Sequence, residues 1–160
     1  MKVRGWSRAA SAFAGLVLVT SLNCGRTEKS PPEGGAAVAT LQVVRPEVTV
    51  RRADQTRRAT WTTRLAAGDH VSAASGRAWI HHDTGVRALL GDGAKLTIAA
   101  RHLTLHRGRI WVEAPAGEPS LLQVGDVRLS ASRAGFEVHA PASGKPTLVV
   151  ARGHVELRAG

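Results

Sequence analysis

The seven histidines are the side chains of this sequence best suited to chemistry, because imidazole is both a metal ligand and an acid–base group. His102 and His106 are four residues apart, a spacing that would suit zinc on a helix. Leu103 and Leu105 alternate with polar residues between them, and this alternation predicts a strand instead. On a strand the two imidazoles share a face but lie about 13 Å apart, which is too far to bind one ion.

The adjacent pair His81 and His82 is no better arranged for a shared ligand, because neighbouring residues of a strand point to opposite faces. No cysteine or glutamate completes a recognisable metal pattern with any histidine. We therefore predict exposed strand histidines and no metal site. The alternative is an envelope metal-binding protein or enzyme that uses these exposed histidines.

Residues for covalent catalysis are equally sparse. The single cysteine, Cys24, lies beside an apolar N-terminal segment, where lipidation would consume its thiol. The serines lack a nucleophile-elbow sequence. Four aspartates lie next to turn glycines, where a carboxylate can accept hydrogen bonds from the turn backbone; these are Asp69, Asp83, Asp92 and Asp126. We expect no catalytic residue, no cofactor and no enzyme activity.

Trp79 and Trp111 are the best candidates for binding. Trp79 lies between Ala78 and Ile80, and Trp111 is likewise flanked by aliphatic residues. If the aliphatic residues face the core, both indoles face outward and form a candidate binding face, since tryptophan is enriched at interfaces. In the alternative, both faces of these strands are buried, as in a stack or between sheets.

The N-terminal residues read as a targeting signal. Lys2, Arg4 and Arg8 precede an apolar run at residues 9–19, which is too short to span a bilayer about 30 Å thick. The run leads to Cys24, in a context that resembles a bacterial lipoprotein cleavage site, although Ser21 and Asn23 replace its usual leucine and small residue. We expect export and lipidation of Cys24, hence anchoring at the periplasmic face of the inner or outer membrane. An uncleaved anchor, or ordinary cleavage near Ala39, is the alternative.

Residues 25–40 are rich in proline, glycine and small side chains, which predicts a flexible linker. From Leu41 to Gly160 the sequence changes character: glycines alternate with short stretches of apolar–polar alternation. Glycine suits tight turns, and period-two alternation predicts strands with one face inward. We therefore predict an all-β domain over residues 41–160, arranged as a solenoid-like stack or a sandwich.

The formal net charge of +10 favours anionic partners such as phosphates, lipid head groups or acidic protein surfaces. Four arginines form the densest basic cluster: Arg51, Arg52, Arg57 and Arg58. No aromatic stacking motif accompanies them, so we interpret the cluster as a solvated hairpin and expect no nucleic-acid partner.

The β-region resembles the periplasmic domain of FecR-type proteins. Residues 65–73, LAAGDHVSA, are similar to its opening motif, and GRAWI at 76–80 and DTGVR at 83–87 resemble the following strand and hairpin. The segments LTLHRGRIWV at 103–112, FEV at 136–138 and LVVARGHV at 148–155 resemble its later strands. The similarity covers about residues 41 to 158, though each motif alone is short and mostly structural.

This resemblance implies a periplasmic β-domain that binds another protein and passes on a signal, which in the founding members reports iron availability to a sigma factor. Those members carry a cytoplasmic anti-sigma segment and a spanning helix before the domain, and a receiving domain after it. Here only the short signal precedes the β-region, so we expect no contact with a sigma factor. The function that we expect is an exported, non-catalytic sensing or binding module for a protein or cell-envelope ligand.

Overall fold

The computed structural model describes residues 35–159, and this range contains strands and turns but no helix. The prediction of an all-β chain is therefore confirmed. Within the described range no helix is long and apolar enough to cross a membrane. The strands are β1 (Ala37–Arg45), β2 (Val48–Arg52), β3 (Gln55–Arg58), β4 (Thr62–Ala66), β5 (His70–Ala73), β6 (Arg77–His82), β7 (Arg87–Leu90), β8 (Ala94–Ile98), β9 (His102–Ala114), β10 (Ser120–Val124), β11 (Val127–Ala140) and β12 (Thr147–Ala159).

The first strand starts inside the segment that we expected to be a linker: β1 begins at Ala37 rather than at Leu41. Its residues Ala39 and Leu41 are already buried. Small residues suit a linker by composition, but here Ala37 pairs with β4, and Ala39 pairs with both β4 and β6. The tertiary pairing thus overrides the local composition.

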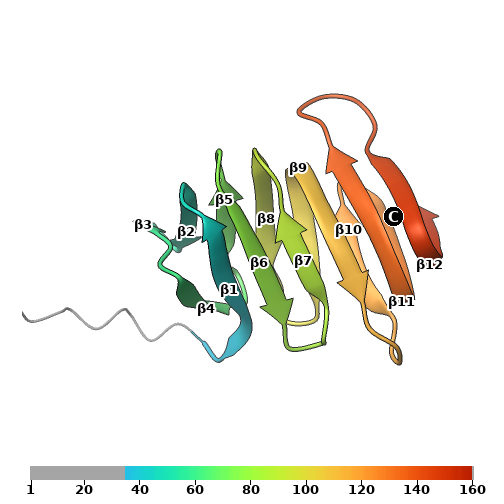
Figure 1. The fold of residues 1–160 in the computed structure, drawn as a ribbon, viewed down its shortest axis with the longest axis horizontal. Coiled ribbons are helices and arrows are strands. Elements are labelled where there is room, and N and C mark those ends of the chain that lie inside the picture. Colours follow the sequence, from blue (N-terminus) through green and yellow to red (C-terminus); the bar gives the residue numbers. More distant parts are fainter. Residues whose placement is uncertain (1–34, 160) are drawn as a thin grey trace, which may run out of the picture. The chain divides into compact units, whose positions relative to one another are not determined.

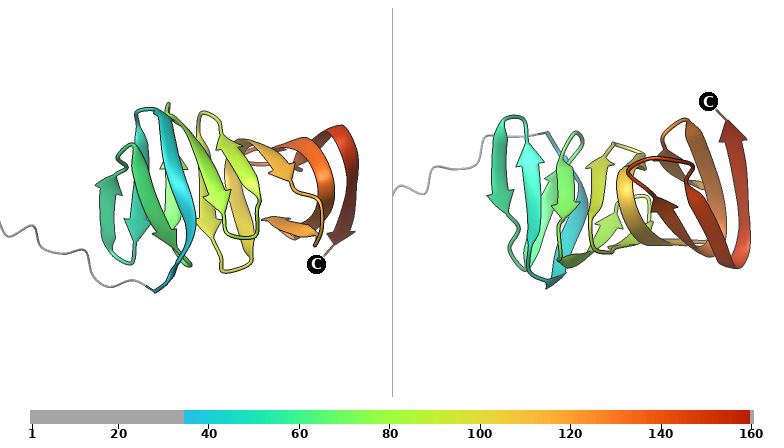
Figure 2. Two further views of the ribbon diagram at one scale, coloured as in Figure 1. Left: turned by 60° about the horizontal axis from the view of Figure 1, so that its bottom comes forward. Right: turned by 90° about the horizontal axis from the view of Figure 1, so that it is seen from above.

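All twelve strands belong to one sheet, which folds over into two layers. One branch, β3-β2-β5-β8, joins the first half of β9, and the other, β4-β1-β6-β7, joins its second half. Figure 1 shows β1, β6 and β7 in front of β2, β5 and β8, and Figure 2 gives two further views of this arrangement. We call the branch through β8 the first layer and the branch through β7 the second layer.

Strands β10, β11 and β12 continue the sheet beyond β9 (Figure 1). Every strand pair is antiparallel except β9 with β10, which is parallel. The apolar residues that alternate along the strands face inward between the layers and form one core cluster. Its largest members include Leu41, Ile80, Leu96, Leu105 and Phe136, all less than 2% exposed.

Two glycines that the sequence pattern places at turns lie within long strands instead. Gly108 lies inside β9 with φ at 90°, and Gly153 lies inside β12 with φ at 79°. A Cβ atom on Gly108 would lie 2.5 Å from Ala94 Cα, and one on Gly153 would lie 2.5 Å from the Arg133 carbonyl oxygen. These glycines allow a continuous strand to bend and approach another backbone closely.

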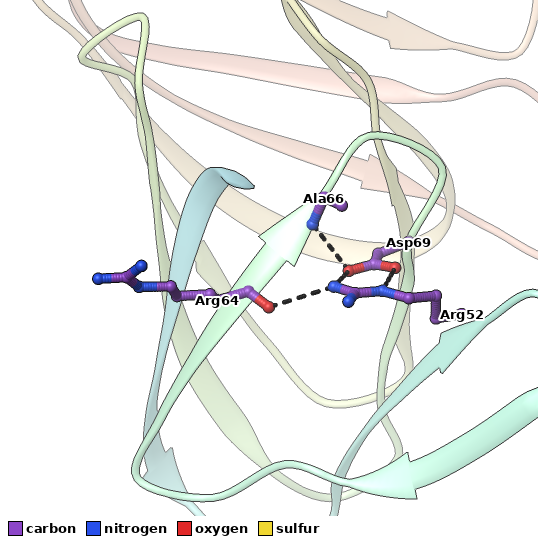
Figure 3. Close-up of polar contacts among 4 residues, drawn as sticks. All are labelled: Arg52, Arg64, Ala66 and Asp69. Carbon is purple, nitrogen blue, oxygen red and sulfur yellow. Dashed lines mark hydrogen bonds and ion pairs between the residues drawn. The ribbon is translucent and has the colours of Figure 1, made fainter. Parts of the chain in front are cut away.

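A partly buried ion pair joins the two layers near β3 and β4 (Figure 3). Arg52 at the end of β2 donates from Nε to Asp69 Oδ1 at 2.8 Å and from Nη2 to Asp69 Oδ2 at 2.7 Å. Asp69 Oδ2 also accepts the Ala66 N–H at 2.9 Å, within the turn between β4 and β5. The aspartate thus accepts a hydrogen bond from its own turn, as predicted, and also holds an arginine from another strand.

Candidate functional site

Trp79 and Trp111 lie in one row across the outer face of the second layer. In the register of the sheet, Trp79 of β6 pairs with Leu89 of β7, and Leu89 pairs with Trp111 of β9. Directly paired residues of antiparallel strands point to the same face. The three side chains are therefore neighbours, and the two tryptophan backbones, two strands apart, are separated by about 10 Å.

Both indoles face away from the core. The neighbours of Trp79, Ala78 and Ile80, are completely buried, while Trp79 itself is half-buried. Trp111 has the same intermediate exposure between the buried Ile110 and Val112. The alternation of β6 and β9 thus places both indoles on the outer surface of the sheet.

Charged side chains connect the two indoles along one side of the row. The guanidinium carbon of Arg87 lies 4.8 Å from the ring centroid of Trp79, a cation–π contact. Arg87 also forms an ion pair with Glu113 at 3.2 Å, and the Trp111 indole N–H points toward Glu113 Oε1 at 3.5 Å. We call Trp79, Leu89 and Trp111, with Arg87 and Glu113, the tryptophan patch.

Trp111 lies over a glycine of the neighbouring strand. A Cβ atom on Gly135 of β11 would be 3.1 Å from Trp111 Cζ2 and 3.0 Å from Arg152 Nε. Gly135 pairs with Glu113 on the same face. The absence of a side chain at Gly135 therefore leaves the space in which the indole and the guanidinium of Arg152 pack.

A third tryptophan, Trp61, lies outside this patch. It immediately precedes β4 and is 78% exposed. It has no cation–π contact among the described residues, in contrast to Trp79. Trp61 is thus an isolated exposed aromatic residue and a natural control for the patch.

The adjacent histidines point to opposite faces, as predicted, but the prediction that the strand histidines are exposed is wrong for His82. His82 is buried, and its Nε2 lies 2.9 Å from the Ala99 carbonyl oxygen while its Nδ1 accepts the Thr84 N–H at 3.2 Å. This pattern requires the proton on Nε2, so His82 is a satisfied structural histidine. His81 instead lies on the outer face, with its ring 6.4 Å from that of Trp79.

The side chain of His106 contacts Thr97, a residue that the sequence analysis did not propose for any site, rather than His102. The hydroxyl of Thr97 is 2.6 Å from His106 Nε2 and 2.8 Å from His70 Nδ1. The two rings are 6.2 Å apart. His70 and His106 are far apart in sequence, so only the strand register brings them together.

Within residues 35–159 no group of three or more histidine, cysteine or acidic side chains is arranged to hold a metal ion. Cys24, the predicted lipidation site, and the signal segment that precedes it lie outside the described residues. Comparisons of the chain with protein-family models, with curated proteins and with solved structures find no match.

Proposed function

We propose that this chain is an exported, non-catalytic binding module of the bacterial cell envelope, similar in role to a FecR-type periplasmic domain. Its partner is a protein or another envelope ligand that docks on the tryptophan patch. The observation that most directly supports this proposal is the strand register, which aligns Trp79, Leu89 and Trp111 on the outer face of the second layer.

Three properties of the patch support this role. Half-exposed indoles offer a large apolar contact area, and tryptophan is enriched among binding hot spots. Arg87 and Glu113 hold the indoles in place, so little conformational freedom is lost when a partner binds. The charged residues also lie beside an apolar centre, an arrangement typical of protein interfaces.

The N-terminal sequence supports the location. A basic start, a short apolar run and a cysteine precede the β-domain, and together they favour export followed by lipidation of Cys24. Replacing Cys24 with serine should release the protein from the membrane fraction or leave the signal uncleaved. Unchanged fractionation and unchanged mass of the Cys24→Ser protein would contradict the anchoring.

The binding role is tested by capture from a cell-envelope extract with the full chain as bait. We expect Trp79→Ala and Trp111→Ala each to weaken capture of the same partner by about 30-fold, which corresponds to about 2 kcal/mol. Trp61→Ala is the matched control, because it removes an exposed indole outside the patch, and it should leave capture unchanged. Equal capture by all three variants would overturn the proposal.

Elemental analysis of the same purified chain separates this proposal from the rival metal-binding function. Stoichiometric metal that is lost on replacement of His70 and His106, with no partner captured, would favour the rival. Thermal unfolding of each tryptophan variant verifies that loss of capture does not reflect loss of the fold.

A further inference from the structure

We infer that the outer face of the first layer carries a second binding site, which takes a phosphate group. The site is an open groove of about 480 Å³ across β2, β5 and β8, with His106 of β9 at its side. It lies on the layer that does not carry the tryptophan patch and does not depend on the function proposed for that patch. We call it the first-layer groove.

Two rows of paired residues form the groove. Thr49, Ser72 and Lys95 are consecutive partners across β2, β5 and β8. Arg51 pairs with His70 in the adjacent row. Because paired residues share a face, these hydroxyl, imidazole and cationic groups converge on one surface.

His106 joins the groove through a β-bulge. Lys95 pairs with Arg107 and Leu96 pairs with Leu105, so His106 is an extra residue on β9. A bulge can redirect a side chain, and bulges often lie beside functional sites. Here the imidazole of His106 reaches the Thr97 hydroxyl, which also contacts His70.

The groove is cationic and lacks an internal counter-charge. Its lining residues include Arg51 and Lys95 but no aspartate or glutamate. Among residues 35–159, several arginines form ion pairs with carboxylates, as Arg52 and Arg58 do, whereas neither Arg51 nor Lys95 does. The acidic group that raises the pKa of His70 is Asp69, which is buried and already bound to Arg52.

The polar groups can satisfy an oxyanion. A hydroxyl donates only one proton, so Thr97 donates to one imidazole and accepts from the other. The opposite nitrogens, His70 Nε2 and His106 Nδ1, have no hydrogen-bond partner within the described part of the chain. The ring that accepts from Thr97 carries its proton on the opposite nitrogen, so in neutral imidazoles one of these two nitrogens is a donor. Together with Arg51, Lys95 and the hydroxyls of Thr49 and Ser72, it can donate to several oxygens of one ligand.

The charge of the groove decides between an anion and a metal ion. Two imidazoles side by side could attract a transition metal, but Arg51 and Lys95 would repel a cation at this position. The two fixed positive charges match the charge of a phosphate monoester, and arginine and lysine are both established phosphate binders. A phosphate group is therefore the ligand that these residues favour.

Titration calorimetry of the full chain with inorganic phosphate tests the site. Arg51→Gln/Lys95→Gln should weaken binding by at least about tenfold, because charge-assisted hydrogen bonds are lost. Arg77→Gln/Arg128→Gln is the matched control, since it removes two exposed arginine charges outside the groove, and it should change binding less than about twofold.

Binding to lipid vesicles tests whether the phosphate group belongs to a lipid head group or to a soluble ligand. Sedimentation with phosphatidylcholine vesicles that contain about one phosphatidic acid in five lipids is compared with pure phosphatidylcholine, for the wild type and both double variants. Groove-dependent binding only to the acidic vesicles assigns a lipid head group, and binding only to free phosphate assigns a soluble ligand. No binding of either probe by the wild type, or equal binding by Arg51→Gln/Lys95→Gln, would overturn the inference.

Discussion

Asp69 and Arg52 form a bidentate pair in which the carboxylate is almost completely buried and the guanidinium reaches solvent. The side chain of Asp69 is 1% exposed and that of Arg52 is 25% exposed. The hydrogen bond to Asp69 raises the pKa of Arg52, partial burial lowers it, and the negative charge of Asp69 raises it further. Arg52 also contacts the Arg64 carbonyl oxygen of β4 at 3.4 Å (Figure 3).

This asymmetry predicts which partner is costlier to remove. Arg52→Ala leaves a buried carboxylate without its counter-charge and should lower the free energy of unfolding by about 3 kcal/mol. Asp69→Ala frees an arginine that can turn to solvent and should cost about 2 kcal/mol, mostly from the unsatisfied Ala66 N–H. Urea unfolding of both single variants and the double variant measures the coupling between them.

The pair between Arg58 and Glu47 is the control for that measurement. Its nitrogen–oxygen distance of 2.8 Å is similar, but the two side chains are 65% and 59% exposed. Arg58→Ala should cost less than about 1 kcal/mol, because exposed ion pairs contribute little. Equal losses for Arg52→Ala and Arg58→Ala would contradict the role of burial.

Gly108 should tolerate replacement by alanine less well than Gly93, although both glycines have a positive φ. Gly108→Ala combines a left-handed backbone with a Cβ 2.5 Å from Ala94 Cα, and should cost about 3 kcal/mol or prevent folding. Gly93 also has a positive φ, but no atom lies within 4 Å of an added Cβ, so Gly93→Ala should cost about 1 kcal/mol. Thermal unfolding of the two variants compares them, and similar melting temperatures would contradict the close approach at β9.

The alternation of the sequence predicts an all-β domain and indicates which residues of a strand share a face. It leaves open whether Trp79 faces outward or is buried between layers, and the structure places Ile80 inward and the half-buried Trp79 on the outer face. The two-layer arrangement was left open because it depends on where long strands bend. Gly108 and Gly153 look like turn glycines in sequence, and only the close contacts with Ala94 and Arg133 show that they lie inside strands.

The pairing of His70 with His106 was not predictable for a related reason. The alternation assigns His106 to the same face as His102, and the structure agrees, but alternation within β9 cannot show which residue of another strand lies beside His106. The register that aligns β5, β8 and β9 is set by the tertiary structure, and no local motif around His70 encodes it. The alternation therefore offers Trp79 and Trp111 as one candidate face, whereas the first-layer groove depends on a strand register that the sequence does not show.

Gly135 should control the position of the Trp111 indole. Gly135→Ala places a methyl group about 3.1 Å from Trp111 Cζ2, closer than ordinary van der Waals contact between carbon atoms. Since the ring and Arg152 are at the surface, we expect them to shift with a loss of stability of only about 1 kcal/mol. The shift should move the tryptophan fluorescence emission and weaken partner capture without removing any aromatic group.

A control in protein that lacks the Trp111 indole shows whether the change in fluorescence emission comes from Trp111. In Trp111→Phe protein, Gly135→Ala should produce a much smaller change in emission, because the indole that it displaces is absent. An identical emission change in both proteins would show that another tryptophan responds to the substitution. Unchanged capture by Gly135→Ala would show that binding does not depend on the position of the Trp111 ring.

His70 should make the stability of the fold depend on pH. Burial lowers its pKa below the ordinary value of 6.5, and the nearby charges of Arg51 and His106 lower it further, while Asp69 opposes them. Lys95 also lines the groove from β8. Because the folded pKa lies below the unfolded pKa, the unfolded chain binds the proton more readily, and stability falls as the pH drops below about 6.5 toward the folded value.

Urea unfolding between about pH 8 and about pH 5 measures this loss. His70→Gln keeps a polar side chain beside Thr97 and should reduce the slope of stability against pH, whereas His154→Gln, on the exposed strand β12, should leave the slope unchanged. Sulfate, which stays a dianion over this range, provides a second readout: it should raise stability more at low pH, because a bound anion favours the protonated imidazole. The same slope in wild type and His70→Gln would show that another group causes the pH dependence.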